Sequence, residues 1–279
     1  MFGARKSWVL PAFATLITVL VGLVTAWWIN GETASIWASF DLAKAGLTDE
    51  YCELNRMGDA VRQPVNAWSN LCYTFLGTWV LGWAWKDFRD PLAHNPMRRF
   101  PAMSMLVGLM LVGLGCGSFF FHASLTNLGQ HFDMGFTYGL TLTLGVGAAY
   151  RLRLNKTRKE TQKARWAFLG LALALATTMA ILKWKVSGKI ALPIMMVTGI
   201  SLAVWVYFRE RARFSGILIG CAVLSTIVAA VFRSIDLAKV GCNSEGLYQS
   251  HAIWHFTTGF AAFLFLAFLR EEKAAPASK

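Results

Sequence analysis

Long apolar segments recur along this 279-residue chain at nearly regular intervals. A helix that crosses the hydrocarbon core of a bilayer needs about 20 mostly apolar residues, with a range of about 17–25. Eight segments of the sequence meet that requirement: 7–28, 66–85, 102–121, 133–150, 166–182, 190–208, 214–232 and 250–269. The pattern predicts an all-α membrane protein with eight crossings.

Composition supports a bilayer as the solvent. Hydrophobic residues make up 56% of the chain and charged residues only 15%, with a mean hydropathy of +0.46. Soluble globular proteins carry about 25% charged residues. The polar surface is therefore too small to cover a soluble protein of this length, whereas lipid accepts apolar surface.

The net charge of +12 is concentrated in short loops between the apolar segments. Basic clusters precede the first segment and follow the second, fourth, sixth and eighth. By the positive-inside rule, eight crossings place both termini and all these clusters in the cytoplasm. A seven-helix count with the same segments would break the alternation. No basic helix or aromatic-basic platform is present, which argues against a nucleic-acid partner.

The remaining loops face outward and carry most of the loop acids. The first segment could be a signal peptide, but its apolar stretch exceeds the usual 7–15 residues and no clear A-x-A site follows. A retained helix is therefore favoured. The expected organisation is an N-terminal membrane helix (1–30), an outward loop (31–65), a helical core (66–270) and a disordered tail (271–279).

Four ionisable residues lie at the outward ends of membrane segments, where such residues are functional candidates. His122 ends the third segment, Asp133 starts the fourth, and His251 and His255 start the eighth. The i, i+4 spacing places the last two imidazoles on one helical face. A third imidazole from His122 would complete a three-ligand catalytic zinc site with one position open for water, and zinc lowers the pKa of such a water to about 7.

Other interpretations of these residues remain open. A single histidine at a helix end is usually interfacial or hydrogen-bonded. His131 is a competing ligand but falls in the predicted loop, and His94 falls on the cytoplasmic side. Ser118 shares a helical face with His122 and could stabilise an oxyanion, or it could simply ease helix packing among neighbouring glycines.

The five cysteines divide between membrane and loops. Cys72, Cys116 and Cys221 lie inside membrane segments and suit packing. Cys52 and Cys242 lie in the two long outward loops, which would face an oxidising compartment. We therefore predict a Cys52–Cys242 disulfide.

Several motifs together resemble the alkaline ceramidases and their superfamily, which includes the progestin–adipoQ receptors. Residues 117–122 (GSFFFH) followed by Asp133 resemble the S-x-x-x-H…D signature, and residues 251–255 (HAIWH) match H-x-x-x-H. Residues 51–55 (YCELN) and 63–70 (QPVNAWSN) resemble W-C-E-x-N…E-x-x-N-x-x-S-N, and that family also has a cysteine in each segment corresponding to Cys52 and Cys242. The resemblance covers roughly residues 50–270.

The resemblance implies a seven-helix transmembrane core, preceded here by an extra N-terminal helix, and hydrolysis of the ceramide amide. His122, His251 and His255 would bind Zn²⁺. Asp133 would take the proton of the zinc-bound water, and Ser118 would steady the oxyanion.

The family's ceramidases also bind calcium before their first core helix. By position, the ligands here would be Glu50, Tyr51, Glu53, Asn55 and Gln63. Calcium prefers six to eight oxygen ligands with carboxylates among them. Glu50 replaces the family's Asp, Tyr51 its Trp and Gln63 its Glu, which puts Ca²⁺ dependence in doubt; the alternative is a polar loop that caps the bundle.

The leading hypothesis is an intramembrane zinc amidase that cleaves ceramide or another N-acyl lipid. The alternative is a receptor-like lipid-binding protein of the same superfamily, which would not need both Ser118 and Asp133. A transporter is a weaker reading, because ionisable groups near the midplane, broken helices and repeats are not apparent.

Overall fold

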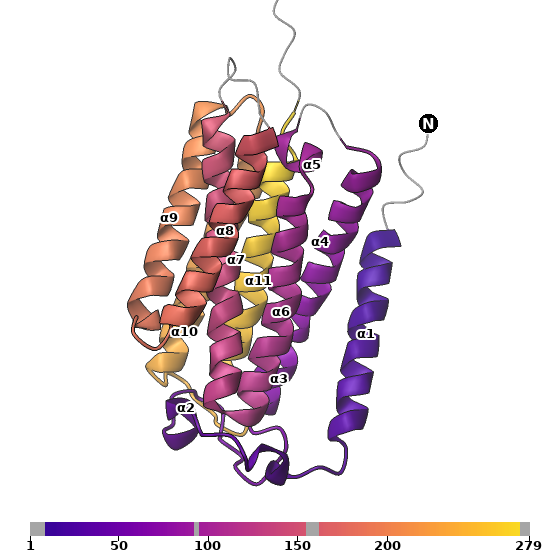
Figure 1. Cartoon of the computed structure of the whole chain (residues 1–279). Coiled ribbons are helices and arrows are strands. Elements are labelled where there is room, and N and C mark those ends of the chain that lie inside the picture. Colours follow the sequence, from indigo (N-terminus) through magenta and orange to yellow (C-terminus); the bar gives the residue numbers. More distant parts are fainter. Residues whose placement is uncertain (1–8, 92–94, 155–161, 274–279) are drawn as a thin grey trace, which may run out of the picture.

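The computed structural model describes residues 9–91, 95–154 and 162–273. Its long helices run side by side as a bundle (Figure 1). They are α1 (Val9–Ile29), α4 (Leu71–Arg89), α6 (Ala102–Ser124), α7 (Asn127–Arg153), α8 (Gln162–Leu182), α9 (Gly188–Arg209), α10 (Gly216–Leu237) and α11 (Ser250–Arg270). Short helices are η1 (Ala34–Trp37), α2 (Lys44–Leu47), α3 (Pro64–Ser69) and α5 (Pro96–Arg99). Across the described ranges the only β pairing is two isolated bridges, so the predicted all-α class is confirmed.

Six of the described helices are long and apolar enough to cross a membrane: α1, α6, α8, α9, α10 and α11. The chain is therefore a multi-pass membrane protein. Helices α4 and α7 are not among the six, although they lie where the second and fourth apolar segments are. Eight crossings remain a prediction.

The second apolar segment is split into α3 and α4 at Asn70. The side-chain amide of Asn70 donates to the Asn66 carbonyl at 2.8 Å, and such bonds compete with the helical backbone pattern. Pro64 occupies the first turn of α3, where its missing N–H costs nothing. The break places a polar turn, Ser69 and Asn70, at the junction between α3 and α4.

Helix α7 begins six residues earlier than the apolar pattern predicted. Its N-cap is Thr126, whose hydroxyl accepts from the Gly129 N–H at 3.1 Å. The first turns are polar, so hydropathy alone misses them. Asp133 therefore lies in the second turn of α7 rather than at its start. His131, expected in a loop, lies on α7 and stacks on Trp184, with ring centroids 6.2 Å apart.

Helices α6, α7 and α11 supply most of the buried residues of the bundle. Helices α8, α9 and α10 expose many large apolar side chains, as expected for surfaces that face lipid. Helix α1 stands at one side of the bundle (Figure 1) and buries only Ala14. It packs mainly against α4, which agrees with an added N-terminal helix outside the core.

The long loop between α1 and α3 crosses one end of the bundle, at which α2 and the α10–α11 connection also lie (Figure 1). The predicted disulfide is present: Cys52 and Cys242 are bonded, with their Cα atoms 5.6 Å apart. Cys72, Cys116 and Cys221 are free. The disulfide therefore joins the loop after α1 to the loop before α11. The first turns of α11 carry two of the candidate zinc ligands, His251 and His255.

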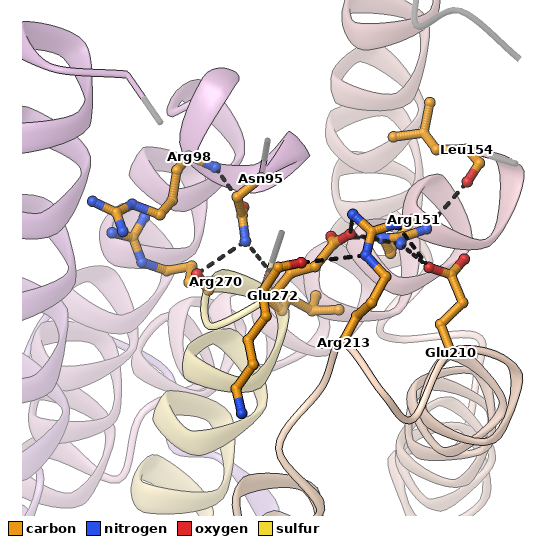
Figure 2. Close-up of polar contacts among 10 residues, drawn as sticks. Asn95, Arg98, Arg151, Leu154, Glu210, Arg213, Arg270 and Glu272 are labelled. Carbon is orange, nitrogen blue, oxygen red and sulfur yellow. Dashed lines mark hydrogen bonds and ion pairs between the residues drawn. The ribbon is translucent and has the colours of Figure 1, made fainter. Parts of the chain in front are cut away.

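At the end of the bundle away from the disulfide, ion pairs join neighbouring helices (Figure 2). Arg151 of α7 pairs with Glu210 at 2.6 Å and with Glu272 at 2.7 Å, and Arg213 also pairs with both acids. Glu272 is buried, so the chain just after α11, predicted from the sequence to begin a disordered tail, is packed against the end of the bundle. Residues 274–279, His94 and the first residues of the predicted N-terminal helix lie outside the described residues.

Candidate metal centre

Three histidines converge at the end of the bundle that carries the disulfide. His122 lies in the last turns of α6, and His251 and His255 lie one turn apart at the start of α11. All three are buried. One ring nitrogen from each lies within 4.8 Å of those of the other two, so the group could hold a metal ion. The ligand set predicted from the sequence is thereby brought together.

Hydrogen bonds orient two of these imidazoles. His122 Nδ1 lies 2.7 Å from Gln63 Oε1, which can only accept, so Nδ1 is the donor. Ser69 donates its hydroxyl hydrogen to the Asn66 carbonyl at 2.8 Å. Its oxygen therefore accepts from His255 Nδ1, 2.7 Å away. With both Nδ1 atoms protonated, the Nε2 lone pairs are left for a metal, which is the usual arrangement at zinc sites.

His251 has a charged pair behind it. Its Nδ1 lies 3.1 Å from Arg233 Nη1 and 3.6 Å from Asp236 Oδ2. Arg233 donates to Asp236 Oδ2 at 2.8 Å, and the Cys52 N–H donates to Asp236 Oδ1 at 3.0 Å. Because an arginine can only donate, His251 Nδ1 accepts from Arg233 in this structure. A metal at Nε2 would require a hydrogen on Nδ1, and Asp236, now 3.6 Å away and beyond hydrogen-bond distance, is the acceptor in this pair to which that hydrogen would turn. The disulfide-bonded Cys52 thus helps to hold the carboxylate behind His251.

Ser118 and Asp133 meet across the α6–α7 contact. The Ser118 side chain is close enough to hydrogen-bond to the Asp133 carboxylate. The helices can approach here because residue 117 is glycine: a Cβ at Gly117 would lie 3.0 Å from the Phe132 carbonyl carbon and 3.2 Å from the Asp133 nitrogen. The predicted pair is therefore brought together beside the histidines.

A cavity of about 1260 Å³ opens at these residues. Ser118, Asp133, His251 and His255 line one part of it. Its other walls come from α7, α9, α10 and α11 and are largely apolar, reaching as deep as Leu144 and Phe265. Leu144 lies eleven residues after Asp133, about 16 Å along α7 at the helical rise. The cavity thus joins the polar site to a long apolar channel.

Sequence reasoning missed several residues that touch the site. Tyr51 was assigned only to the calcium loop, but its buried ring packs against His251 and His122, with centroids 4.5 and 5.1 Å apart. Burial also raises the pKa of the Tyr51 phenol above its usual value. Arg233 was missed because the apolar segment was taken to end at residue 232. An arginine near a membrane segment is itself a signal of function that could have found it.

Lys183, in the α8–α9 turn, also faces the cavity. Its amine donates to Gln130 Oε1 at 3.1 Å and lies 3.4 Å from the centre of the Trp184 ring. Burial lowers the pKa of this amine to about 8, and the Asp133 carboxylate opposes the shift. At neutral pH Lys183 therefore brings a positive charge to the side of the cavity where Asp133 lies.

Three of the five residues proposed for calcium, Glu53, Asn55 and Gln63, already hydrogen-bond to one another or to the backbone. Both carboxylate oxygens of Glu53 accept backbone N–H bonds at 2.7 Å, from Val65 and Asn66. Burial raises the pKa of Glu53, and these two bonds oppose that shift. Gln63 points its amide nitrogen toward Asn55 Oδ1, 2.7 Å away. As arranged, these residues do not fit a calcium ion.

The fold and the site together define a multi-pass helical membrane protein with a buried three-histidine centre. The chain belongs to the Ceramidase family, whose family model matches residues 48–276. The matched region starts after α1 and includes every residue described above for the metal centre. No match was found among curated proteins. Family membership implies hydrolysis of amides and confirms the resemblance seen in the motifs.

Proposed function

We propose that the protein is a zinc-dependent amidohydrolase that cleaves ceramide or a similar N-acyl lipid to a long-chain base and a fatty acid. The observation that carries this proposal is the single cavity that joins His251, His255, Ser118 and Asp133 to an apolar channel. A binding protein would need the channel but not a proton carrier beside a metal centre.

The histidines suit zinc by their chemistry. Three neutral imidazoles with an open fourth position are typical of catalytic zinc sites. When bound, zinc supplies a Lewis acid and an activated water at neutral pH. Gln63, Ser69 and Asp236 would keep the ligand rings in the required orientation.

Asp133 would carry the proton in this reaction. Water adds its oxygen to the acyl carbon, and the C–N bond breaks. The Asp133 carboxylate accepts the proton of the attacking water and delivers it to the leaving nitrogen, since an unprotonated amide nitrogen is a poor leaving group. Ser118, hydrogen-bonded to Asp133 in the free protein, would donate to the oxygen of the tetrahedral intermediate.

The charge of the cavity mouth bears on the head group of the substrate. Six cationic side chains line the cavity: Lys44, Lys183, Lys185, Lys189, Arg233 and Lys239. Three acids line it with them: Asp49, Glu50 and Asp133. The excess of positive charge favours polar or anionic head groups over cationic ones.

The test is a substrate panel with purified protein in lipid nanodiscs. Neutral ceramide, a phosphorylated ceramide and an N-acyl amino acid are each incubated with the enzyme, and fatty-acid release is measured. We expect release from at least one of them, loss of that release on zinc chelation and its return on adding zinc. Tight binding of these lipids without release from any of them would favour the receptor-like alternative instead.

A further inference from the structure

Gln63 connects the outward loop to the metal centre. Its side chain is completely buried. Its Oε1 lies 2.7 Å from His122 Nδ1, and its Nε2 donates to Asn55 Oδ1 at 2.7 Å and toward the Glu53 carbonyl at 3.5 Å. One amide group therefore contacts both a candidate zinc ligand and the loop that precedes α3.

The direction of this amide is set by its neighbours. Asn55 uses its own Nδ2 to donate to the Ala45 carbonyl at 2.9 Å and the Thr48 carbonyl at 3.3 Å. Its Oδ1 is thereby turned toward Gln63. On the other side, His122 needs an acceptor for Nδ1–H if Nε2 is to face a metal. Both neighbours place Gln63 Oε1 at His122 and Nε2 at Asn55.

The amide nitrogen thus points its hydrogens at two loop oxygens, the Asn55 side-chain oxygen and the Glu53 carbonyl. A cation in this position would coordinate those same oxygens. A calcium ion would require six to eight oxygens at about 2.3–2.6 Å, but the Glu53 carboxylate is already engaged by backbone N–H groups. The neutral amide satisfies the oxygens without any ion.

We propose that Gln63 takes the place of a cation in this chain. Its amide closes the outward loop onto His122, so that the loop is ordered without calcium. A carboxylate at position 63 would still accept from His122, but its second oxygen would face the oxygens of Asn55 and Glu53. Those oxygens would repel one another unless a cation lay between them. The side chain at position 63 therefore decides whether the loop needs calcium.

The test compares wild type with Gln63→Glu, both loaded with zinc in calcium-depleted buffer. Thermal unfolding is measured with and without about 1 mM CaCl₂, a concentration suited to weak calcium modules. We expect the wild-type Tm to be unchanged by calcium. The Gln63→Glu variant should melt lower without calcium and recover by roughly 5 °C with it. Elemental analysis after gel filtration in calcium should find calcium bound to the variant and not to wild type.

Gln130→Glu is the matched control, because it adds the same charge on the same side of the bundle but away from Asn55. It should show no response to calcium. Stoichiometric calcium in wild type, or a wild-type Tm that rises with calcium, would overturn the proposal even if Gln63→Glu failed to fold. A folded Gln63→Glu variant whose Tm does not change with calcium and that binds no calcium would also overturn the proposal. These measurements read stability and ion content, so they stand apart from whether the protein is an amidase.

Discussion

The partners behind the three histidines differ in charge. Gln63 and Ser69 are neutral acceptors for His122 and His255, whereas His251 has the Arg233–Asp236 ion pair behind it. A carboxylate behind a ligand imidazole raises its basicity and fixes its orientation. Neutralising the two acids of the site, Asp133 and Asp236, should therefore have different effects: the first on turnover and the second on zinc binding.

Asp133→Asn should lower turnover by at least about a hundredfold, the lower part of the range for a general acid–base group. An amide in that position can neither accept the proton of the attacking water nor protonate the leaving nitrogen. Zinc content and Tm should stay close to wild type, because the carboxylate lies beside the metal centre but is not one of the three ligands. Fatty-acid release and zinc analysis on the same preparation check this.

Asp236→Asn provides the contrast. It should weaken zinc binding by about 10–100-fold, as is typical when a partner of a ligand histidine is lost, and excess zinc should restore much of the activity. Asp59→Asn, an exposed acid of the loop between α1 and α3, is the neutral control. If zinc-saturated Asp133→Asn kept full turnover while zinc-saturated Asp236→Asn lost it, the two roles would have to be exchanged.

At the scale of the helices, the site depends on how closely α6 approaches α7. Gly117 allows the backbone near Asp133 to lie against α6, one residue before Ser118 and five before His122. Membrane helices commonly use small residues for such contacts. Any side chain at position 117 would separate the serine and histidine from the aspartate.

Gly117→Val should destabilise the protein by about 1–3 kcal/mol, the usual effect of overpacking. It should also lower activity by more than the loss of folded protein explains, since Asp133 would be displaced from Ser118. Gly170→Val, on an open face of α8 with no neighbouring atom within 4 Å, is the matched control. Thermal unfolding and specific activity of the folded fraction check both variants; equal melting temperatures would show that this contact does not limit stability.

At the scale of the whole molecule, the two ends of the bundle differ. One end carries the disulfide, the loop over the bundle and the metal centre. The other carries the ion pairs of Arg151, Glu210, Arg213 and Glu272. Another buried pair there, Asp87 with Arg270, links α4 to the end of α11. The basic residues in the last turns of α4, α7, α9 and α11 also lie at this second end, which favours a cytoplasmic location for it.

We expect both termini to lie in the cytoplasm and the metal centre to face the opposite, oxidising side. A reporter that works only in the cytoplasm should be active at the C-terminus and inactive when inserted beside the exposed Glu245. The disulfide requires the same orientation, because it persists only in an oxidising compartment. An active reporter at Glu245, in protein that still folds, would contradict the eight-crossing arrangement.

Much of the fold and the ligand set could be predicted from the sequence because the signals are local. An apolar stretch of about 20 residues has few alternatives to a membrane helix, and the i, i+4 spacing of His251 and His255 places them on one face wherever that helix packs. Errors arose where polar residues continue a helix, as at the start of α7 and the end of α10, since hydropathy does not register them. For that reason His131 was misplaced and Arg233 was overlooked.

What the sequence by itself determined is which residues are buried in lipid and which histidines can share a metal. The tertiary structure alone decided which residue lies behind each histidine. Gln63 and Ser69 lie at the two ends of α3, and Asp236 lies on α10, where its carboxylate accepts a hydrogen bond from the Cys52 N–H. Gln63 is 59 positions from His122, Ser69 is 186 positions from His255, and Cys52 is 184 positions from Asp236. These contacts depend on the path of the loop after α1, which the disulfide and the Gln63 amide hold in place and which no local pattern specifies.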